Sequence, residues 1–83
     1  MGYHVYIIQS RKDNSFYIGQ TSDLRDRLLR HNQGRSGYTR SKRPWDLVHS
    51  EEFESRSQAV KREASLKSLH RKDLLIDLIH SSG

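Results

Sequence analysis

Two short runs rich in β-branched and aromatic residues open this chain, and a polar segment separates them. The first run covers residues 3–9 and the second covers residues 16–20, and their Val, Ile, Tyr and Phe side chains favour strands. The segment 11–15 contains Asp13 and Asn14, whose short side chains bond to the local backbone in turns. The beginning of the chain is therefore predicted to form a β-hairpin.

A hairpin built on this turn brings two tyrosines together. Pairings centred on residues 11–15 place Tyr6 opposite or diagonal to Tyr17, within the cross-strand reach of large side chains. A buried ring with its hydroxyl at the rim of a core is also common in proteins without a catalytic site. The residues alone leave both interpretations of the tyrosine pair open.

A helix is predicted directly after the hairpin. Asp23 offers an N-cap oxygen and suits the positive end of the helix dipole. Leu24, Leu28 and His31 recur at i, i+4 and i+7, so they share one face of this helix. The helix is expected to end near residues 32–34, where an asparagine and a glycine stand.

A third strand is predicted over residues 45–53, directly after Pro44. Side chains alternate between the two faces of a strand. We therefore expect Trp45, Leu47 and His49 on one face and the residues between them on the other.

Two helices are predicted in the last part of the chain. Ser55 and Gln58 match a capping-box pattern that opens a helix to about Leu69, and a shorter helix follows over residues 72–80. The order β-β-α-β-α-α indicates an α+β fold with a three-stranded sheet covered by helices. A chain of 83 residues is too short for two stable cores, so residues 1–83 are expected to form a single domain.

The chain is basic, which favours a polyanionic partner. Fifteen Lys and Arg against ten Asp and Glu give a formal charge of +5, and cations that neutralise nucleic-acid phosphates release counterions. Many of these cations fall in or near a loop predicted over residues 33–43: Arg25, Arg27, Arg30, Arg35, Arg40, Lys42 and Arg43. A nucleic-acid-binding loop and an ordinary solvated loop explain this clustering equally well.

Several protein classes are disfavoured by what the sequence lacks. No run approaches the roughly 18 apolar residues of a membrane span, and the amino end has no signal-peptide core. The absence of cysteine weakly favours a reducing compartment, so a cytoplasmic protein is expected. The histidines show no zinc-ligand spacing, and no glycine-rich phosphate loop follows a strand, which disfavours an NTPase.

Glu63 is the most unusual residue of the predicted helix 55–69. The inward stripe of that helix is expected to contain Ala59, Glu63, Leu66 and His70, with Val60 alongside. A carboxylate on such a stripe is costly to bury unless it meets a cation, a donor or a metal. The alternative is an edge position at which Glu63 reaches solvent or pairs with Lys67 at i+4.

Arg27 and His31 stand four residues apart and point from the same side of the first helix. The forked guanidinium of arginine matches phosphate geometry and can stabilise charge that develops on phosphoryl oxygens. A solvated arginine beside a histidine at the edge of the core is the simpler alternative. Arg25 and Arg30 are interpreted as ordinary exposed arginines without a catalytic role.

Taken in order, these residues resemble the GIY-YIG nuclease domain. The first signature corresponds to His4-Val5-Tyr6 and the second to Tyr17-Ile18-Gly19, and the later residues of the pattern are Leu24, Arg27, His31 and Glu63. The segments YTRSKRPWDLV and EEFESRSQAVKREASLKSL also resemble those of small stand-alone bacterial members. The resemblance spans essentially the whole chain. It implies a small three-stranded antiparallel sheet with flanking helices.

The resemblance also implies a metal-dependent endonuclease and a role for each site residue. Tyr17, or else Tyr6, would help to activate water as a general base, and Arg27 would stabilise the developing phosphorane charge. His31 would contact a tyrosine hydroxyl or the phosphate, and Glu63 would hold one Mg²⁺ or Mn²⁺ acting as a Lewis acid.

The basic loop is expected to contact nucleic acid, and DNA is favoured over RNA as the substrate. No membrane partner and no small-molecule cofactor are expected. The expected contact residues are Arg35, Tyr38, Arg40, Lys42 and Arg43. Backbone contacts of this kind position a substrate with little base discrimination.

The chain departs from the family pattern in two places. His4 and Val5 replace the Gly and Ile of the first signature, a change at strand positions away from the chemistry. Gln20 stands where several active members carry a lysine that assists the base, which implies weak activity. A metal-dependent endonuclease is therefore the leading hypothesis. A non-catalytic nucleic-acid-binding module comes second, and a protein-interaction adaptor that uses the Trp45 strand and the last helix comes third.

Overall fold

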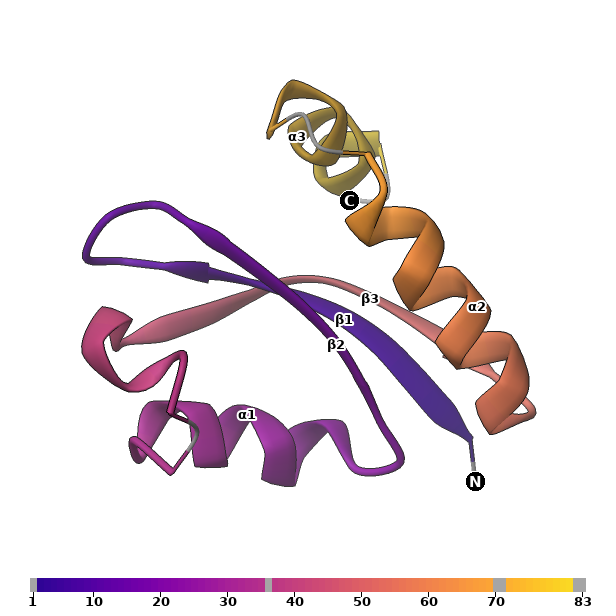
Figure 1. Cartoon of the computed structure of the whole chain (residues 1–83), viewed down its shortest axis with the longest axis horizontal. Coiled ribbons are helices and arrows are strands. Elements are labelled where there is room, and N and C mark those ends of the chain that lie inside the picture. Colours follow the sequence, from indigo (N-terminus) through magenta and orange to yellow (C-terminus); the bar gives the residue numbers. More distant parts are fainter. Residues whose placement is uncertain (1, 36, 70–71, 82–83) are drawn as a thin grey trace.

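The structure is a computed structural model that describes residues 2–35, 37–69 and 72–81 (Figure 1). The elements follow the predicted order, with one additional 3₁₀ turn at Arg40–Lys42. They are β1 (Tyr3–Ser10), β2 (Phe16–Thr21), α1 (Leu24–Asn32), β3 (Trp45–Phe53), α2 (Arg56–Lys67) and α3 (Lys72–Ser81).

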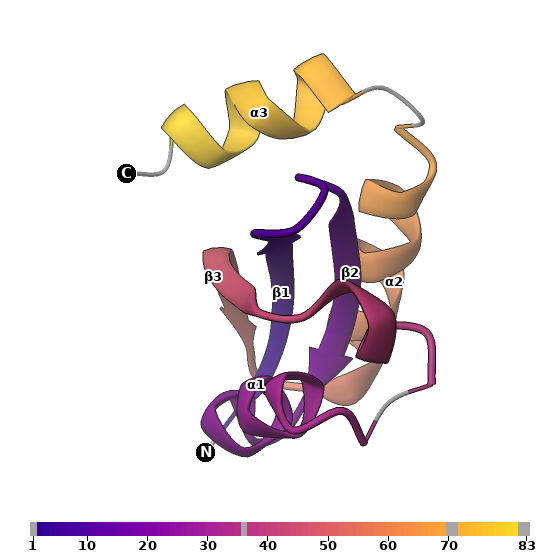
Figure 2. The ribbon, with the colours of Figure 1, turned by 90° about the vertical axis from the view of Figure 1, so that its left-hand side faces the viewer.

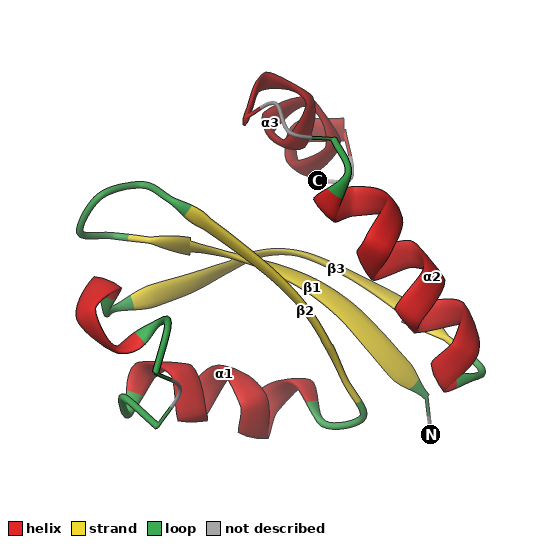
Figure 3. Ribbon diagram, viewed as in Figure 1, coloured by secondary structure: helices red, strands yellow, loops and turns green. Residues whose placement is uncertain are grey.

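The three strands form one antiparallel sheet in the order β2-β1-β3 (Figure 3). β1 is therefore the central strand and β2 is an edge. α1 packs against one face of the sheet, whereas α2 and α3 pack against the other (Figure 2). Within the described part of the chain, no helix is long and apolar enough to cross a membrane.

The sheet separates two apolar clusters, which explains why β1 is buried on both faces. The cluster under α2 and α3 is built from Val5, Ile7, Ile18, Ala59 and Leu66. The cluster under α1 is built from Tyr6, Ile8 and Trp45, with Tyr17, Leu24 and Leu28 packed against it. Each cluster is small, and both depend on the alternation of side chains along β1.

The strand register resolves the arrangement of the two tyrosines. Tyr6 is paired with Gly19, and Tyr17 is paired with Ile8, so the two tyrosines are diagonal neighbours on the α1 face. Their ring centroids are 6.4 Å apart. The prediction that the hairpin brings these rings together is confirmed.

The prediction for the faces of β3 is wrong at one residue. The pairing of β1 with β3 shifts between Ile7 and Ile8, so that Ile7 faces His49 while Ile8 faces Leu47. The residue between them, Val48, is the extra residue of a β-bulge, and a bulge breaks the alternation of faces. Trp45 and Leu47 consequently share the α1 face, whereas His49 lies on the α2 face.

α2 presents a narrower apolar stripe than predicted. Ala59 and Leu66 are buried, and Glu63 between them is partly buried. Val60, expected alongside this stripe, is instead 46% exposed because it is rotated about 100° away from Ala59 around the helix axis. The fourth expected member, His70, lies outside the described residues.

The helix caps form as their local sequences predict. The Asp23 side chain accepts a hydrogen bond from the backbone of Asp26, and Ser55 and Gln58 make both bonds of the capping box. Gly34 follows α1 with a φ of +79°, a backbone conformation that favours glycine.

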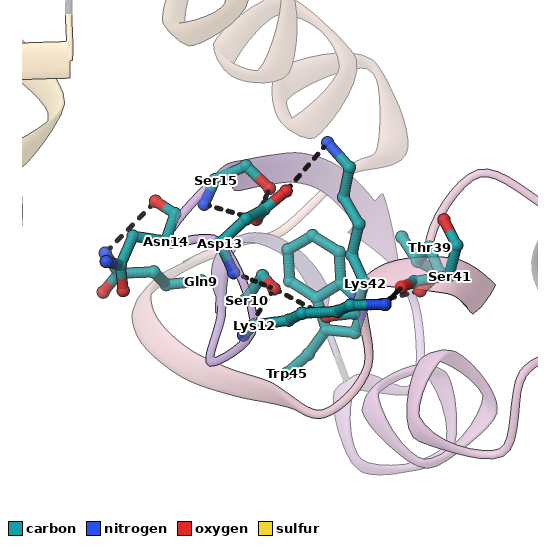
Figure 4. Close-up of polar contacts among 10 residues, drawn as sticks. All are labelled: Gln9, Ser10, Lys12, Asp13, Asn14, Ser15, Thr39, Ser41, Lys42 and Trp45. Carbon is teal, nitrogen blue, oxygen red and sulfur yellow. Dashed lines mark hydrogen bonds and ion pairs between the residues drawn. The ribbon is translucent and has the colours of Figure 1, made fainter.

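Contacts with the β1–β2 turn hold the basic loop in place (Figure 4). The Ser10 hydroxyl donates to the Lys42 carbonyl at 2.6 Å, and the Lys12 ammonium donates to the Ser41 carbonyl at 3.1 Å. The Lys42 ammonium lies 3.5 Å from the Asp13 carboxylate. The second half of the loop is therefore docked against the hairpin.

Candidate active site

Three of the five predicted catalytic residues line one hollow beside α1. This hollow, called here the arginine hollow, has a volume of about 490 Å³ and is lined by Tyr17, Arg27, Arg30, His31 and Arg35. Three guanidinium groups around one opening make it strongly electropositive. Arg35 was expected to contact nucleic acid, whereas Arg30 was interpreted as an ordinary surface residue.

A buried hydrogen-bonded chain lies under the arginine hollow. The Tyr6 hydroxyl is 2.9 Å from Nε2 of His31, and Nδ1 of His31 is 2.8 Å from the Thr39 hydroxyl. The Trp45 indole N–H in turn donates to the Thr39 carbonyl at 2.9 Å. Tyr6 and His31, which are 25 positions apart in sequence, are thus held in one orientation by the loop that carries Thr39.

The protonation states in this chain follow from burial. Burial raises the pKa of Tyr6 to about 12, and Tyr17 adds to this rise, while the neighbouring Arg27 guanidinium acts against it. Burial, and then the charge of Arg27, lower the pKa of His31 below its ordinary value. Near pH 7, Tyr6 is a phenol and His31 is a neutral ring with one donating and one accepting nitrogen.

Tyr17 is the tyrosine that water can reach. Tyr6 is 1% exposed, whereas Tyr17 is partly exposed and borders the arginine hollow. The Tyr17 ring lies 5.0 Å from that of His31 and 6.4 Å from that of Trp45, centroid to centroid. Among the described residues, no hydrogen-bond partner is found for the Tyr17 hydroxyl, which leaves it available to water or substrate.

Glu63 lies on α2, which packs on the face of the sheet opposite α1. Its carboxylate is 2.7 Å from the Lys67 ammonium, and its side chain is 20% exposed. Its negative charge also contributes to the raised pKa of Tyr6. The i,i+4 ion pair is therefore present, whereas Glu63 is not among the described residues that line the arginine hollow.

The other expected contact residues divide into two groups. Arg40 and Arg43 donate to the carbonyls of Gly34 and Arg40 respectively, so these arginines stabilise the loop itself. Tyr38 is 62% exposed, and the Lys42 ammonium lies 5.4 Å from the centroid of its ring. Tyr38 and Lys42 thus form an exposed aromatic and cationic pair.

Arg27 borders a second, smaller opening that the sequence analysis missed. This hollow of about 260 Å³ is lined by Tyr3, Gln20, Thr21, Ser22, Arg27 and Arg56. Neither Arg56 nor Thr39 belongs to a spacing pattern that would have identified it. Only the tertiary structure places these residues beside Arg27 and His31.

The glycine of the second signature is required by the position of Tyr6. A Cβ atom at Gly19 would lie 2.6 Å from the Tyr6 hydroxyl oxygen. Gly19→Ala is expected to displace the Tyr6 ring, weaken its bond to His31 and lower the free energy of unfolding by about 1–3 kcal/mol in urea denaturation. Gly37→Ala is the matched control, since a Cβ there meets no atom within 4 Å. Equal stability of the two variants would contradict this packing.

The neutral state of His31 predicts a dependence of stability on pH. In the unfolded chain this histidine takes up a proton below about pH 6.5, whereas in the folded chain its pKa is lower. The contribution of neutral His31 to the free energy of unfolding is therefore complete above that pH and is lost as the pH falls. Urea denaturation from pH 7.5 to 5 should show a steeper loss for wild type than for His31→Gln, by at most about 1.4 kcal/mol per pH unit. Parallel pH profiles would exclude a buried neutral His31.

Comparison with known proteins supports the resemblance in the sequence. A UPF0213 protein of Listeria welshimeri is 44% identical over 71 residues, which cover 84% of this chain and 79% of that protein. A UPF0213 protein of Staphylococcus saprophyticus is 38% identical over 74 residues, which cover 88% of this chain and 89% of that protein.

Structure and family comparisons agree with these relatives. The solution NMR structure of the UPF0213 protein BH0048 from Bacillus halodurans matches with a TM-score of 0.59 and 36% identity, covering 94% of this chain and 85% of that one. The predicted antiparallel α+β fold is thereby confirmed. The family model described as the GIY-YIG catalytic domain matches residues 2–75. The chain therefore belongs to the GIY-YIG family, which is of the nuclease type, and its relatives are small UPF0213 proteins.

Proposed function

We propose that this protein is a metal-dependent endonuclease that hydrolyses phosphodiester bonds, with DNA favoured over RNA as the substrate. The observation that carries the proposal is the convergence of Tyr17, Arg27 and His31 on one arginine-lined hollow. We assign Glu63 of α2 as the carboxylate of the site; its charge is the smallest of the influences that raise the pKa of Tyr6. Family membership supports the same reaction class.

The arginine hollow is suited to a backbone phosphate. Arg27 borders two adjoining openings, one lined also by Arg30 and Arg35 and the other by Arg56. A nucleic-acid strand could therefore cross Arg27 with one phosphate in each opening. A guanidinium placed there would donate to the non-bridging oxygens and stabilise the charge that develops on them during attack. We therefore assign Arg27 to stabilisation of the transition state.

Tyr17 is the better candidate for the group that contacts the attacking water. Its partly exposed ring borders the arginine hollow, whereas the Tyr6 hydroxyl is buried against His31 and its pKa is raised to about 12. We assign Tyr17 to orienting the attacking water and, in its phenolate form, to accepting the proton of that water. Tyr6 and His31 then act as positioning residues, because their hydrogen-bonded rings pack against Tyr17 and fix its orientation.

The residues at Glu63 fit a single Mg²⁺ or Mn²⁺. Mg²⁺ binds through one or two carboxylates together with substrate phosphates and water, and Glu63 would supply one such carboxylate while the phosphate lies in the arginine hollow. Bound there, the ion would supply Lewis-acid stabilisation of the scissile phosphate. Glu63 would have to exchange the Lys67 ammonium for the metal.

The test is cleavage of supercoiled plasmid, single-stranded DNA and branched DNA with Mg²⁺, with Mn²⁺ and with EDTA. The proposal expects cleavage of at least one substrate that requires a divalent ion and disappears in EDTA. The absence of metal-dependent cleavage on every substrate, together with retained binding, would favour the second function below.

A non-catalytic nucleic-acid-binding module is the alternative function. Two observations favour it: Lys67 occupies the Glu63 carboxylate, and Gln20, not a lysine, lines the opening beside Arg27. Such a module would bind nucleic acid with a steep salt dependence, since its affinity comes from phosphate contacts, and would not cleave it. Binding measured at two salt concentrations alongside the cleavage assay separates the two functions.

A further inference from the structure

A third hollow adjoins the arginine hollow at Tyr17 and differs from it in chemistry. It has a volume of about 280 Å³ and is lined by Phe16, Tyr17, Ile18, Tyr38, Lys67 and Leu75. Aromatic and aliphatic side chains dominate this lining, so we call it the aromatic hollow. Tyr17 belongs to both hollows, which places them side by side.

The exposed wall of the aromatic hollow is formed by Tyr38. Its ring is 62% exposed, lies 5.8 Å from the Tyr17 ring and is held near the Lys42 ammonium at 5.4 Å. Lys42 is itself attached to the hairpin through Asp13 and Ser10 (Figure 4). A large aromatic ring that is exposed but anchored, next to cations, has the properties of a platform on which nucleobases stack.

The opposite wall is the edge of the sheet. β2 pairs only with β1, so every second residue of β2 directs its backbone N–H and C=O groups away from the sheet. A nucleobase combines two apolar faces with a rim of donors and acceptors. The aromatic side chains of the hollow can pack against the faces of a base, and the backbone groups of β2 can hydrogen-bond to its rim. A purely aliphatic ligand would leave those backbone groups without a hydrogen bond.

The charge of the aromatic hollow argues against a second phosphate. Lys67 is the one cationic side chain among the described residues that line it, and it is already paired with Glu63 at 2.7 Å. The arginine hollow beside it carries three guanidinium groups, of which that of Arg30 is paired with Asp26 at 3.0 Å. The two hollows therefore divide the parts of a nucleotide between them, with the phosphate on the arginines and the base on the aromatic residues.

We propose that the aromatic hollow binds one unpaired nucleobase of the strand whose phosphate lies in the arginine hollow. The inference rests on the proposed function, since it assumes a nucleic-acid strand in that second hollow. Tyr38 is then a residue that contacts a base, and Leu75 of α3 forms part of the base site. A base that is paired and stacked in a duplex could not enter.

The test compares the affinities of the full chain for two tetranucleotides, measured without divalent ion. One tetramer is made of thymidine nucleotides and the other of abasic nucleotides, and both carry the same phosphates. NMR titration should show that wild type binds the thymidine tetramer roughly 5-fold or more tightly than the abasic one. The methyl signals of Ile18 and Leu75 should shift only with the thymidine tetramer. Tyr38→Ala should lower the affinity for the thymidine tetramer far more than that for the abasic tetramer, so that the preference is lost, while Tyr38→Phe should retain the preference.

Leu29→Ala is the matched control, because Leu29 is also highly exposed, at 54%, but lines neither hollow. It should keep the preference for bases. Equal affinities of wild type for the two tetramers, or an equal loss for both in Tyr38→Ala, would refute the base site and leave the phosphate site standing. Failure of wild type to bind either tetramer at low salt would refute the proposed function as well.

Discussion

Arg27→Ala is expected to lower kcat/KM for metal-dependent cleavage by about 100- to 1000-fold, the usual effect of removing one donor aimed at a developing oxyanion. Arg27 lines the arginine hollow together with Tyr17 and His31, so its loss removes a cation from the hollow in which both lie. Arg27→Lys should recover only part of the activity, because an ammonium cannot make the bidentate contact of a guanidinium. Steady-state cleavage of the preferred substrate, with Mg²⁺ at saturation, measures the effect.

Arg25→Ala is the matched control for this prediction. Arg25 lies on the same helix and is exposed, but it lines neither opening beside Arg27. Arg25→Ala removes the same net charge as Arg27→Ala. The difference in kcat/KM between the two variants is therefore free of any general electrostatic contribution to binding. If Arg25→Ala and Arg27→Ala reduce cleavage equally, Arg27 contributes only to the overall charge and the assigned site is wrong.

Glu63→Gln is expected to abolish metal-dependent cleavage and to weaken Mn²⁺ binding measured directly by calorimetry. The loss of affinity should exceed the roughly 10- to 100-fold effect of removing an outer-shell partner, because Glu63 is the one carboxylate assigned to the ion. The fold should be little affected, since the Glu63–Lys67 pair lies on the helix surface and such pairs contribute only about 0.3–0.5 kcal/mol.

Lys67→Met should have the opposite effect on metal affinity. The Lys67 ammonium occupies the Glu63 carboxylate at 2.7 Å, so its removal eliminates a competitor and a repelling charge. Mn²⁺ should therefore bind more tightly to Lys67→Met than to wild type. Glu54→Gln, at an exposed position before α2, serves as the control and should leave Mn²⁺ binding unchanged. Unaltered Mn²⁺ affinity in both Glu63→Gln and Lys67→Met would contradict a metal site at Glu63.

Much of the candidate site could be predicted because its residues lie on regular elements. The hairpin turn, the Asp23 cap and the Ser55–Gln58 capping box are local features, and all of them form as expected. A correct hairpin register then brings Tyr6 near Tyr17, and α1 carries Arg27 and His31 to the same face of the sheet. Local hydrogen bonding and side-chain periodicity were sufficient for these predictions.

The errors arose where long-range contacts override a local pattern. A bulge at Val48 moves His49 to the α2 face, where its Nε2 lies 2.7 Å from Glu51, and Arg62 of α2 also binds this carboxylate. No periodicity in β3 indicates the extra residue, because a bulge depends on how two strands fit together.

The strands, helices and caps of this protein, and the residue types available for chemistry, follow from local sequence. Those properties depend on neighbouring residues and on spacing along one element. Two features of the site come from long-range packing instead: Tyr6 is buried against His31, which contacts Thr39, and Tyr17 is partly exposed. Burial, pKa and ion pairing depend on groups that are distant in sequence and meet only when the sheet and helices pack.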